Sequence, residues 1–390
     1  MSGTVSMSGT GSMSGTGGIH APVTAAGTAT LTARLTARLT ATHAVEVDPA
    51  GVRWPVVDGI TWRRTGRDEL RRRAVDLLDC GDVAAARVAL LADADDWWDE
   101  PAPPPEQLAR AADAATMREA MALLGLGRVG DYFAHRWSDP SYLAALALLQ
   151  AHWPGNRPVV ELGCGAGHLL GELADRGVDD LVGVDVAFSK LWLAQRFVCP
   201  QARYVCGDAC SLPALGVPTP AYVLCIDALY FLPDKPAVVA ALQQLAGPGG
   251  SVVIGHAHTP AEVHSAGEPL TPGEYRQLLG TDLVYDDDAL TDAFLTGQSP
   301  RRGADGRARA VALVAGDPLA AGPDLRAPVA GRPLRLNPLY DAAGVRHWPS
   351  ERWAQEYDRA GEYLPARVDP QALPVDAVAT RVLLDLPECW

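Results

Sequence analysis

Lysine is almost absent from this chain of 390 residues, because only Lys190 and Lys235 occur and arginine supplies the rest of the positive charge. Acidic residues outnumber basic ones by 47 to 33, and the formal net charge is −14. The longest basic run, Arg71-Arg72-Arg73, is expected on the solvated face of an amphipathic helix. Because proteins that bind nucleic acids through phosphates usually carry a basic face, the composition argues against a nucleic-acid substrate.

Long apolar runs, a secretion signal and paired cysteines are absent as well. No apolar run is long enough to cross a bilayer, and the N-terminal region has no apolar segment of the signal-peptide kind. The seven cysteines contain no CxxC pair, which favours reduced thiols and a cytoplasmic location. Cys206 and Cys210 could be drawn with His256 or His258 as a metal site, but the spacing does not support one, and we expect no metal.

Composition divides the chain into four parts. Residues 1–43 lack acidic residues and repeat MSGT and LTAR, so we expect a disordered, low-complexity leader. Residues 44–105 alternate apolar and polar positions around turn signals, which predicts a small accessory region with a β-meander followed by helices. We expect the main domain over residues 106–316 and a C-terminal extension over residues 317–390.

The C-terminal extension is rich in proline but also in aromatic residues. These are Tyr340, Trp348, Trp353, Tyr357 and Tyr363. A free tail would expose too much apolar surface, so we expect the extension to pack back on the core. It serves there either as a lid over an acceptor or as a structural brace.

Strands and helices alternate after residue 157. Five continuous apolar runs predict strands, and they cover residues 158–162, 180–186, 202–208, 221–227 and 251–257. Such runs separated by helices are typical of a parallel sheet that is buried on both faces. Segments near 282–315 predict a closing antiparallel pair. The expected fold class is therefore α/β, with a doubly wound, mostly parallel seven-stranded sheet.

The first of these strands leads into a glycine-rich turn, ELGCGAG, over residues 161–167. A glycine turn after the first strand of such a sheet brings backbone N–H groups and a helix N-terminus toward a ligand. A dinucleotide site would need the pattern GxGxxG. Residue 168 is histidine, so that pattern fails.

ELGCGAG resembles the first motif, E/DxGxGxG, of class I S-adenosylmethionine-dependent methyltransferases. The resemblance implies a Rossmann-like methyltransferase fold and S-adenosylmethionine as the cofactor. It also implies that the backbone of Gly163, Gly165 and Gly167 approaches the methionine part of the cofactor. Glu161 is then expected to help hold its amino group.

Later strands carry further motifs of this family in the expected order, over roughly 155–255. Asp185 ends VGVDV, where the resemblance implies hydrogen bonds to the ribose hydroxyls. Asp208 and Ala209 in YVCGDA match the third-strand motif, whose aspartate binds the exocyclic amine of adenine. Asp227 falls where the main chain of the fourth-strand motif lines the pocket under the sulfonium. Taken singly, each of these acidic residues could instead cap a helix or lie in a solvated turn.

Residues outside these motifs are candidates for the substrate and for catalysis. Tyr132 and Arg136 lie where many family members have a helix over the cofactor, and they either reach cofactor or substrate or pack onto the sheet. Tyr230 lines the acceptor pocket or belongs to the core. His256 and His258, at the carboxyl end of the fifth strand, are candidates for a general base. The alternative for both is a capping or packing role, and His264 in the following loop is a weaker candidate.

The segment DALY, residues 227–230, departs from the N/D-P-P-Y signature of amino methyltransferases that act on DNA bases or glutamine. Together with the acidic charge, this favours a small-molecule acceptor that is methylated on oxygen, carbon or an amine. We therefore expect a cytoplasmic methyltransferase without nucleic-acid or membrane partners. Two alternatives stay open: an enzyme that acts on RNA or protein, and a protein that binds the cofactor without transferring its methyl group.

Overall fold

The computed structural model describes residues 43–94, 101–153, 155, 157–210, 219–316 and 324–390. The disorder predicted over residues 1–43 falls outside these ranges, except at His43. Residues 42–390 form one unit. No helix among the described residues has the length and apolar character that crossing a membrane requires.

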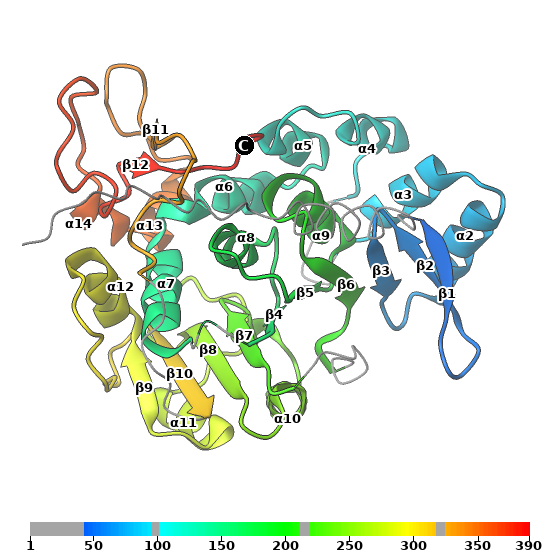
Figure 1. Ribbon diagram of the computed structural model, residues 1–390, viewed down its shortest axis with the longest axis horizontal. Helices are drawn as coiled ribbons and strands as arrows, with labels where there is room; N and C mark the ends of the chain where they lie inside the picture. Colours follow the sequence, from blue (N-terminus) through cyan, green and yellow to red (C-terminus); the bar gives the residue numbers. More distant parts are fainter. Residues whose placement is uncertain (1–42, 95–100, 154, 156, 211–218, 317–323) are drawn as a thin grey trace, which may run out of the picture. The chain divides into compact units, whose positions relative to one another are not determined.

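Among the described residues, the core of this unit is one sheet of ten strands (Figure 1). In chain order they are β1 (Ala44–Val47), β2 (Arg53–Val57), β3 (Ile60–Arg63), β4 (Val159–Leu162), β5 (Leu181–Asp185), β6 (Arg203–Gly207), β7 (Tyr222–Ile226), β8 (Ser251–His258), β9 (Leu283–Asp286) and β10 (Ala310–Gly316). In space their order is β1-β2-β3-β6-β5-β4-β7-β8-β10-β9. The strands from β6 to β8 are parallel, and β10 pairs antiparallel with both β8 and β9. This confirms the predicted α/β sheet and its closing pair.

The three N-terminal strands extend the predicted seven-stranded sheet. β3 pairs in parallel with β6, from Ile60 opposite Tyr204 to Arg63 opposite Gly207. Without β3, the N–H and C=O groups of β6 would form an open sheet edge that needs hydrogen-bond partners. The predicted meander is present as β1, β2 and β3, and it joins the sheet because it satisfies this edge.

Helices cover both faces of the sheet. They are α2 (Asp68–Asp79), α3 (Val83–Leu91), α4 (Pro105–Ala111), α5 (Met117–Leu123), α6 (Gly127–His135), α7 (Pro140–His152), α8 (His168–Asp175), α9 (Phe188–Leu193), α10 (Lys235–Ala246), α11 (Pro272–Leu279) and α12 (Asp287–Thr296). Val159 belongs to the core beneath α7 and α9, and Val160 to the core beneath α10 and α11. Successive side chains of a strand point to opposite faces, so the continuous apolar strands build two cores.

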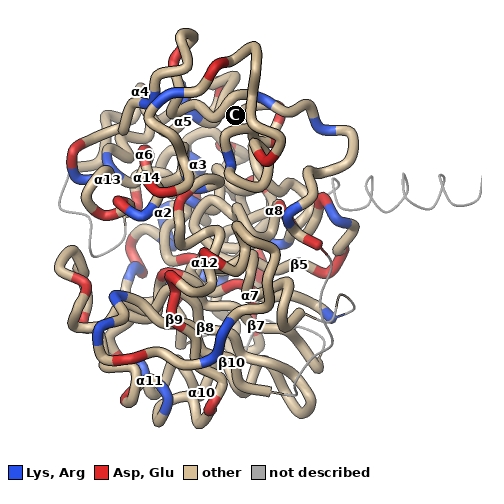
Figure 2. Tube along the Cα trace, turned by 90° about the vertical axis from the view of Figure 1, so that its left-hand side faces the viewer, with Lys and Arg blue, Asp and Glu red and all other residues tan. Residues whose placement is uncertain are grey.

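The C-terminal extension packs back on the core, as its aromatic content predicts. It contains β11 (Arg335–Leu336), α13 (Glu351–Glu356), α14 (Ala360–Tyr363) and β12 (Leu383–Leu384). The Tyr363 hydroxyl donates a hydrogen bond of 2.7 Å to the carbonyl oxygen of Ser138, and the Trp353 side chain is buried. Figure 2 shows Lys and Arg residues interspersed with Asp and Glu residues along the described part of the chain.

Candidate active site

A cavity of about 420 Å³ opens at the carboxyl ends of β4, β5, β7 and β8. Its lining includes most of the residues that the sequence singles out, namely Tyr132, Arg136, Glu161, Gly163, Gly165, Asp185, Ala209, Asp227, Tyr230, His256, His258 and His264. Parallel strands bring their carboxyl ends to one edge of a sheet, which is where ligands bind in this architecture. Gly167 and Asp208 are predicted site residues that do not line the cavity.

The glycine turn adopts a backbone that other residues would strain. Gly163 and Gly165 have φ angles of 70° and 52°, in the left-handed region. A Cβ atom on Gly163 would lie 2.7 Å from Cβ of Ala228, and one on Gly165 would lie 2.9 Å from the Phe133 ring. Gly167 instead caps the N-terminus of α8 and lies against Ala194. The turn thus packs tightly against Ala228 and Phe133, and its first two glycines line the cavity.

Glu161 is the buried acid at the base of this turn. The residue is 4% exposed, and its Oε2 atom has no hydrogen-bond partner among the described residues. Burial raises the pKa of Glu161 to about 8. A buried acceptor without a partner is costly, so the position fits a cationic group such as the amino group of a bound cofactor.

Replacing Glu161 with glutamine is expected to stabilise the cofactor-free protein most at alkaline pH. Burial shifts its pKa from 4.5 to about 8, so the folded state retains a proton that the unfolded state releases. The resulting stabilisation is complete below a pH of about 4.5 and is lost as the pH rises through about 8. Glutamine cannot ionise. The melting temperature of Glu161→Gln, relative to that of the wild type, should therefore rise between about pH 5 and pH 9.

Differential scanning calorimetry across this pH range provides the measurement. Glu106→Gln is the matched control, because Glu106 is exposed in α4. A difference between Glu161→Gln and wild type that does not change with pH would contradict the assignment.

Asp185 fastens the glycine turn to β5. Its Oδ2 atom accepts a hydrogen bond of 3.0 Å from the Gly165 N–H, and its Oδ1 atom accepts one of 2.9 Å from the Ala187 N–H. The Lys190 ammonium lies 3.8 Å from Oδ1. Asp185 lines the same cavity as Glu161. Its role toward a ribose stays a prediction.

Asp208 has a different partner from the one that the sequence suggests. Its Oδ2 atom accepts hydrogen bonds of 2.7 Å from the Thr65 N–H and 2.8 Å from the Thr65 hydroxyl. Thr65 follows β3, which pairs beside β6 and so reaches the end of that strand. The adjacent Ala209 does line the cavity. The adenine contact of Asp208 therefore stays a prediction, and Thr65 competes for the same carboxylate.

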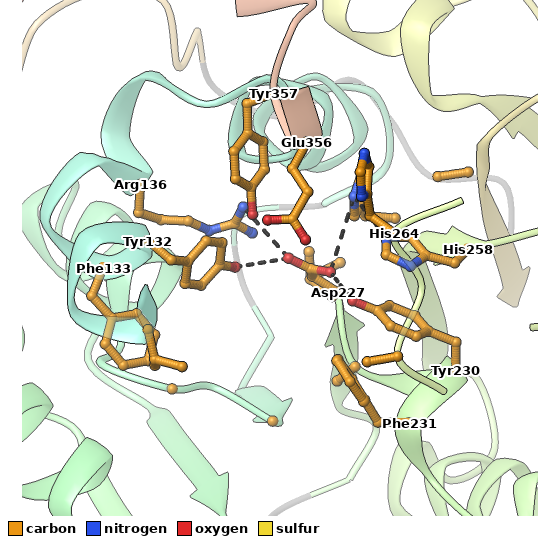
Figure 3. Close-up of a pocket in the computed structure, with 18 of the residues that line it drawn as sticks. Tyr132, Phe133, Arg136, Asp227, Tyr230, Phe231, His258, His264, Glu356 and Tyr357 are labelled. Atoms are coloured by element: carbon orange, nitrogen blue, oxygen red, sulfur yellow. Dashed lines mark hydrogen bonds and ion pairs between the residues drawn. The ribbon is translucent and has the colours of Figure 1, made fainter. Parts of the chain in front are cut away.

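The side chain of Asp227 is the centre of the polar part of the cavity (Figure 3). The Tyr132 hydroxyl donates a hydrogen bond of 2.8 Å to Oδ2, and the Tyr230 hydroxyl donates one of 2.7 Å to Oδ1. Nη1 of Arg136 lies 3.9 Å from Oδ2. Burial opposes ionisation, but the charges of His256 and Arg136 outweigh it and lower the pKa of Asp227. The sequence predicts only a main-chain role here, so the carboxylate is a new finding.

His256 and His258 meet beside this carboxylate. His256 Nε2 lies 3.3 Å from His258 Nε2 and 4.0 Å from Asp227 Oδ1. His258 stacks on the Tyr230 ring with a centroid distance of 3.8 Å. Asp287, the first residue of α12, lies 2.7 Å from His256 Nδ1 through its Oδ2 atom. Sequence reasoning missed Asp287 because it follows the histidines by about thirty residues and belongs to no motif.

The two histidines differ in their protonation. Burial opposes the charged form of His256, but the charges of Asp287 and Asp227 outweigh it and raise its pKa to about 9. Burial, followed by the charge on His256, lowers the pKa of His258 to about 4. The general base predicted at these positions stays a prediction.

The C-terminal extension contributes a wall of the same cavity. The rings of Tyr357 and Tyr132 stack with a centroid distance of 6.2 Å, and Trp353 lies 4.8 Å from Tyr357 by the same measure. Figure 3 shows Tyr357 and Glu356 directed toward Asp227 from above. Neither residue belongs to a motif in the sequence, and only the packing of the extension brings them to the site.

Comparison with known proteins identifies the fold around this cavity. Residues 159–250 match a family model described as a methyltransferase domain. The chain carries a class I S-adenosylmethionine-dependent methyltransferase domain. This methyltransferase domain contains the glycine turn and the ends of β4, β5, β6 and β7, so the family resemblance inferred from the motifs is confirmed.

Relatives of known name share part of the methyltransferase domain. A ubiquinone biosynthesis O-methyltransferase of Methylococcus capsulatus is 36% identical over 132 residues, which are 30% of this chain and 55% of the relative. An enzyme of the same name from Idiomarina loihiensis is 29% identical over 133 residues, covering 30% and 54%. The chain thus spans about half the length of the relatives that it matches.

Two solved structures of methyltransferases are similar to this chain over 31% and 45% of its length. The structure of CalS10, an amino pentose methyltransferase from Micromonospora echinaspora, is 28% identical and covers 31% of this chain and 52% of that one, with a TM-score of 0.27. The CcbJ methyltransferase from Streptomyces caelestis is 18% identical and covers 45% and 88%, with a TM-score of 0.36.

Proposed function

We propose that this chain transfers the methyl group of S-adenosylmethionine to a small-molecule acceptor inside the described cavity. The observation that carries the proposal is that one cavity is lined both by the glycine turn and by Asp227, His256 and His258. A cofactor and a polar acceptor group would therefore share one enclosure. Its volume of about 420 Å³ falls in the range of small-molecule sites.

The residues at the glycine turn fit the proposed cofactor. The unpartnered Oε2 atom of Glu161 suits its amino group, and the carboxylate of Asp185 suits the ribose hydroxyls. Gly163 and Gly165 line the cavity, so their backbone is within reach of a ligand there. When bound, the cofactor supplies an electrophilic methyl group. The protein then contributes alignment of the two reactants and exclusion of water.

Polar and aromatic side chains together fit an acceptor with a hydroxyl group on an apolar body. Tyr132, Tyr357 and Trp353 supply the aromatic surface, and the cluster around Asp227 supplies hydrogen-bonding groups. The names of the relatives support oxygen as the methylated atom. In this reaction the acceptor oxygen bonds to the methyl carbon, the carbon–sulfur bond breaks with its electron pair left on sulfur, and the hydroxyl proton passes to solvent.

A panel of phenols, with amines of similar size for comparison, tests the proposal. The purified full chain should release S-adenosylhomocysteine only when an acceptor is present, and mass spectrometry should find a product that is one CH2 heavier. Reactions without an acceptor serve as the control. Binding of S-adenosylmethionine in a calorimeter without turnover on any acceptor would contradict the proposal and favour a cofactor-binding partner protein. Methylation of amines alone would reject oxygen as the acceptor atom.

A further inference from the structure

The ends of β7 and β8 bring together three groups that are ligands for metal ions in proteins. Asp227, His256 and His258 each offer one ligand atom, and these three atoms lie within 4.8 Å of one another. We propose that Asp227, His256 and His258 bind a divalent metal ion such as Zn²⁺. The ion's remaining coordination position would face the cavity. Two histidines and one carboxylate with an open position are typical of catalytic zinc sites.

The distances fit such an ion. A metal–nitrogen distance of about 2.1 Å places two ligand atoms of a tetrahedral ion about 3.4 Å apart. The Nε2 atoms of His256 and His258 are 3.3 Å apart, and the distance from His256 Nε2 to Asp227 Oδ1 is 4.0 Å. Binding of the ion would draw Asp227 Oδ1, which also accepts the Tyr230 hydrogen bond, closer to the imidazoles. Mg²⁺ and Ca²⁺ prefer oxygen ligands, so the two imidazoles favour a transition metal.

Residues around the ligands hold them in place. Asp287 Oδ2 accepts from His256 Nδ1 at 2.7 Å, and such a carboxylate–histidine pair turns the other ring nitrogen toward a metal. The stack on Tyr230 fixes the ring of His258. Tyr230 and Tyr132 donate hydrogen bonds to Asp227, which orients its carboxylate. Metal-binding carboxylates are commonly hydrogen-bonded in this way.

The backbone is distorted where the ligands lie. Val311 of β10 pairs with Ala257 and Leu313 pairs with Ile254, so two residues of β8 lie opposite one residue of β10. This β-bulge contains His256, whose φ angle is 46°, and Asp227 at the end of β7 has a φ angle of 55°. Bulges near sites re-aim side chains, and left-handed backbone at residues other than glycine costs stability. Both distortions coincide with a ligand.

An ion at this position would bind the hydroxyl oxygen of the acceptor. It would lower the pKa of that hydroxyl group and hold its oxygen in place. This role rests on the proposed function, whereas binding of the ion does not. In this assignment the two histidines are ligands rather than the general base that the sequence predicts.

The test uses the full chain without a histidine tag, after treatment with a chelator. Zn²⁺ is titrated in a calorimeter and Co²⁺ is followed by its visible absorption. We expect about one ion per chain and Co²⁺ bands of a low-coordinate nitrogen and oxygen site. His258→Ala should abolish this binding. Asp287→Asn leaves all three ligands in place and should weaken it about 10- to 100-fold. Both variants are checked for folding by circular dichroism.

His347→Ala is the matched control, because His347 also pairs with an aspartate, Asp341, at 3.0 Å but is exposed and does not line the cavity. It should bind both ions like the wild type. No saturable binding, or equal binding by wild type and His258→Ala, would overturn the inference. Full methyl transfer by chelator-treated protein would overturn the role of the ion and leave the proposed function intact. Ion binding without any methyl transfer would support the site and count against the proposed function.

Discussion

Replacement of Arg136 with methionine is expected to lower the free energy of unfolding by about 3–5 kcal/mol, the usual cost of breaking a buried ion pair on one side. Arg136 is 5% exposed, and its Nη1 atom lies 2.8 Å from Asp139 Oδ1 and 3.9 Å from Asp227 Oδ2. The guanidinium also lies over the Tyr132 ring. Methionine fills much of the same volume, so the expected loss of stability does not come from a cavity. It comes from the carboxylates of Asp139 and Asp227, which stay buried without their cation.

Urea unfolding followed by tryptophan fluorescence measures this loss. The matched control is Arg53→Met, because Arg53 pairs with Asp79 at 2.7 Å while both side chains are about half exposed. Exposed pairs contribute little, so its unfolding curve should nearly overlay that of the wild type. Equal destabilisation by the two variants would show that burial of the Arg136 charge is not the cause.

The affinity for S-adenosylmethionine is expected to fall at least about 10-fold when Asp185 is replaced with alanine. A hydrogen bond to a charged group is worth about 1.5–3 kcal/mol, and one such bond to a ribose hydroxyl accounts for a change of this size. Asp185 also holds the Gly165 and Ala187 N–H groups. Asp185→Asn keeps an oxygen acceptor while removing the charge, so it should lose less affinity than Asp185→Ala.

Calorimetric titration with S-adenosylmethionine compares these variants with Asp180→Ala. Asp180 is an exposed aspartate that precedes β5 at the opposite end of the strand, and its replacement should leave the affinity unchanged. Melting curves establish that each variant is folded. Wild-type affinity in both Asp185 variants would remove this residue from the proposed cofactor site.

Local sequence patterns predict the sheet and one part of the site well. Each central strand is a continuous apolar run, and each connection is too long for a hairpin, so a parallel sheet follows from the order of the elements. Glu161 lies one residue before the end of β4 and Asp185 ends β5, and both line the cavity. The same reasoning is less informative for Asp208, because its partner Thr65 follows β3, a strand that the motif does not include.

The polar cluster illustrates what a motif does not contain. His256 and His258 are singled out by their place at the end of β8. As metal ligands, however, the sequence suggests them only in combination with Cys206 and Cys210, and no metal is expected from that spacing. The fold instead places them beside Asp227, at the ends of the neighbouring strands β7 and β8, and brings in Asp287 from α12. Spacing along the chain does not report such a grouping, since strand pairing and a β-bulge create it.

The sequence by itself determined the α/β sheet, the glycine turn and the edge of the sheet at which the cavity lies, because these depend on hydrophobic periodicity and backbone geometry within short segments. Only the tertiary structure decided the pairing of β3 with β6, the partners of Asp227 and the wall formed by Trp353, Glu356 and Tyr357. These features depend on packing between segments that lie far apart in the chain. Such packing is set by the whole buried core rather than by any local pattern of residues.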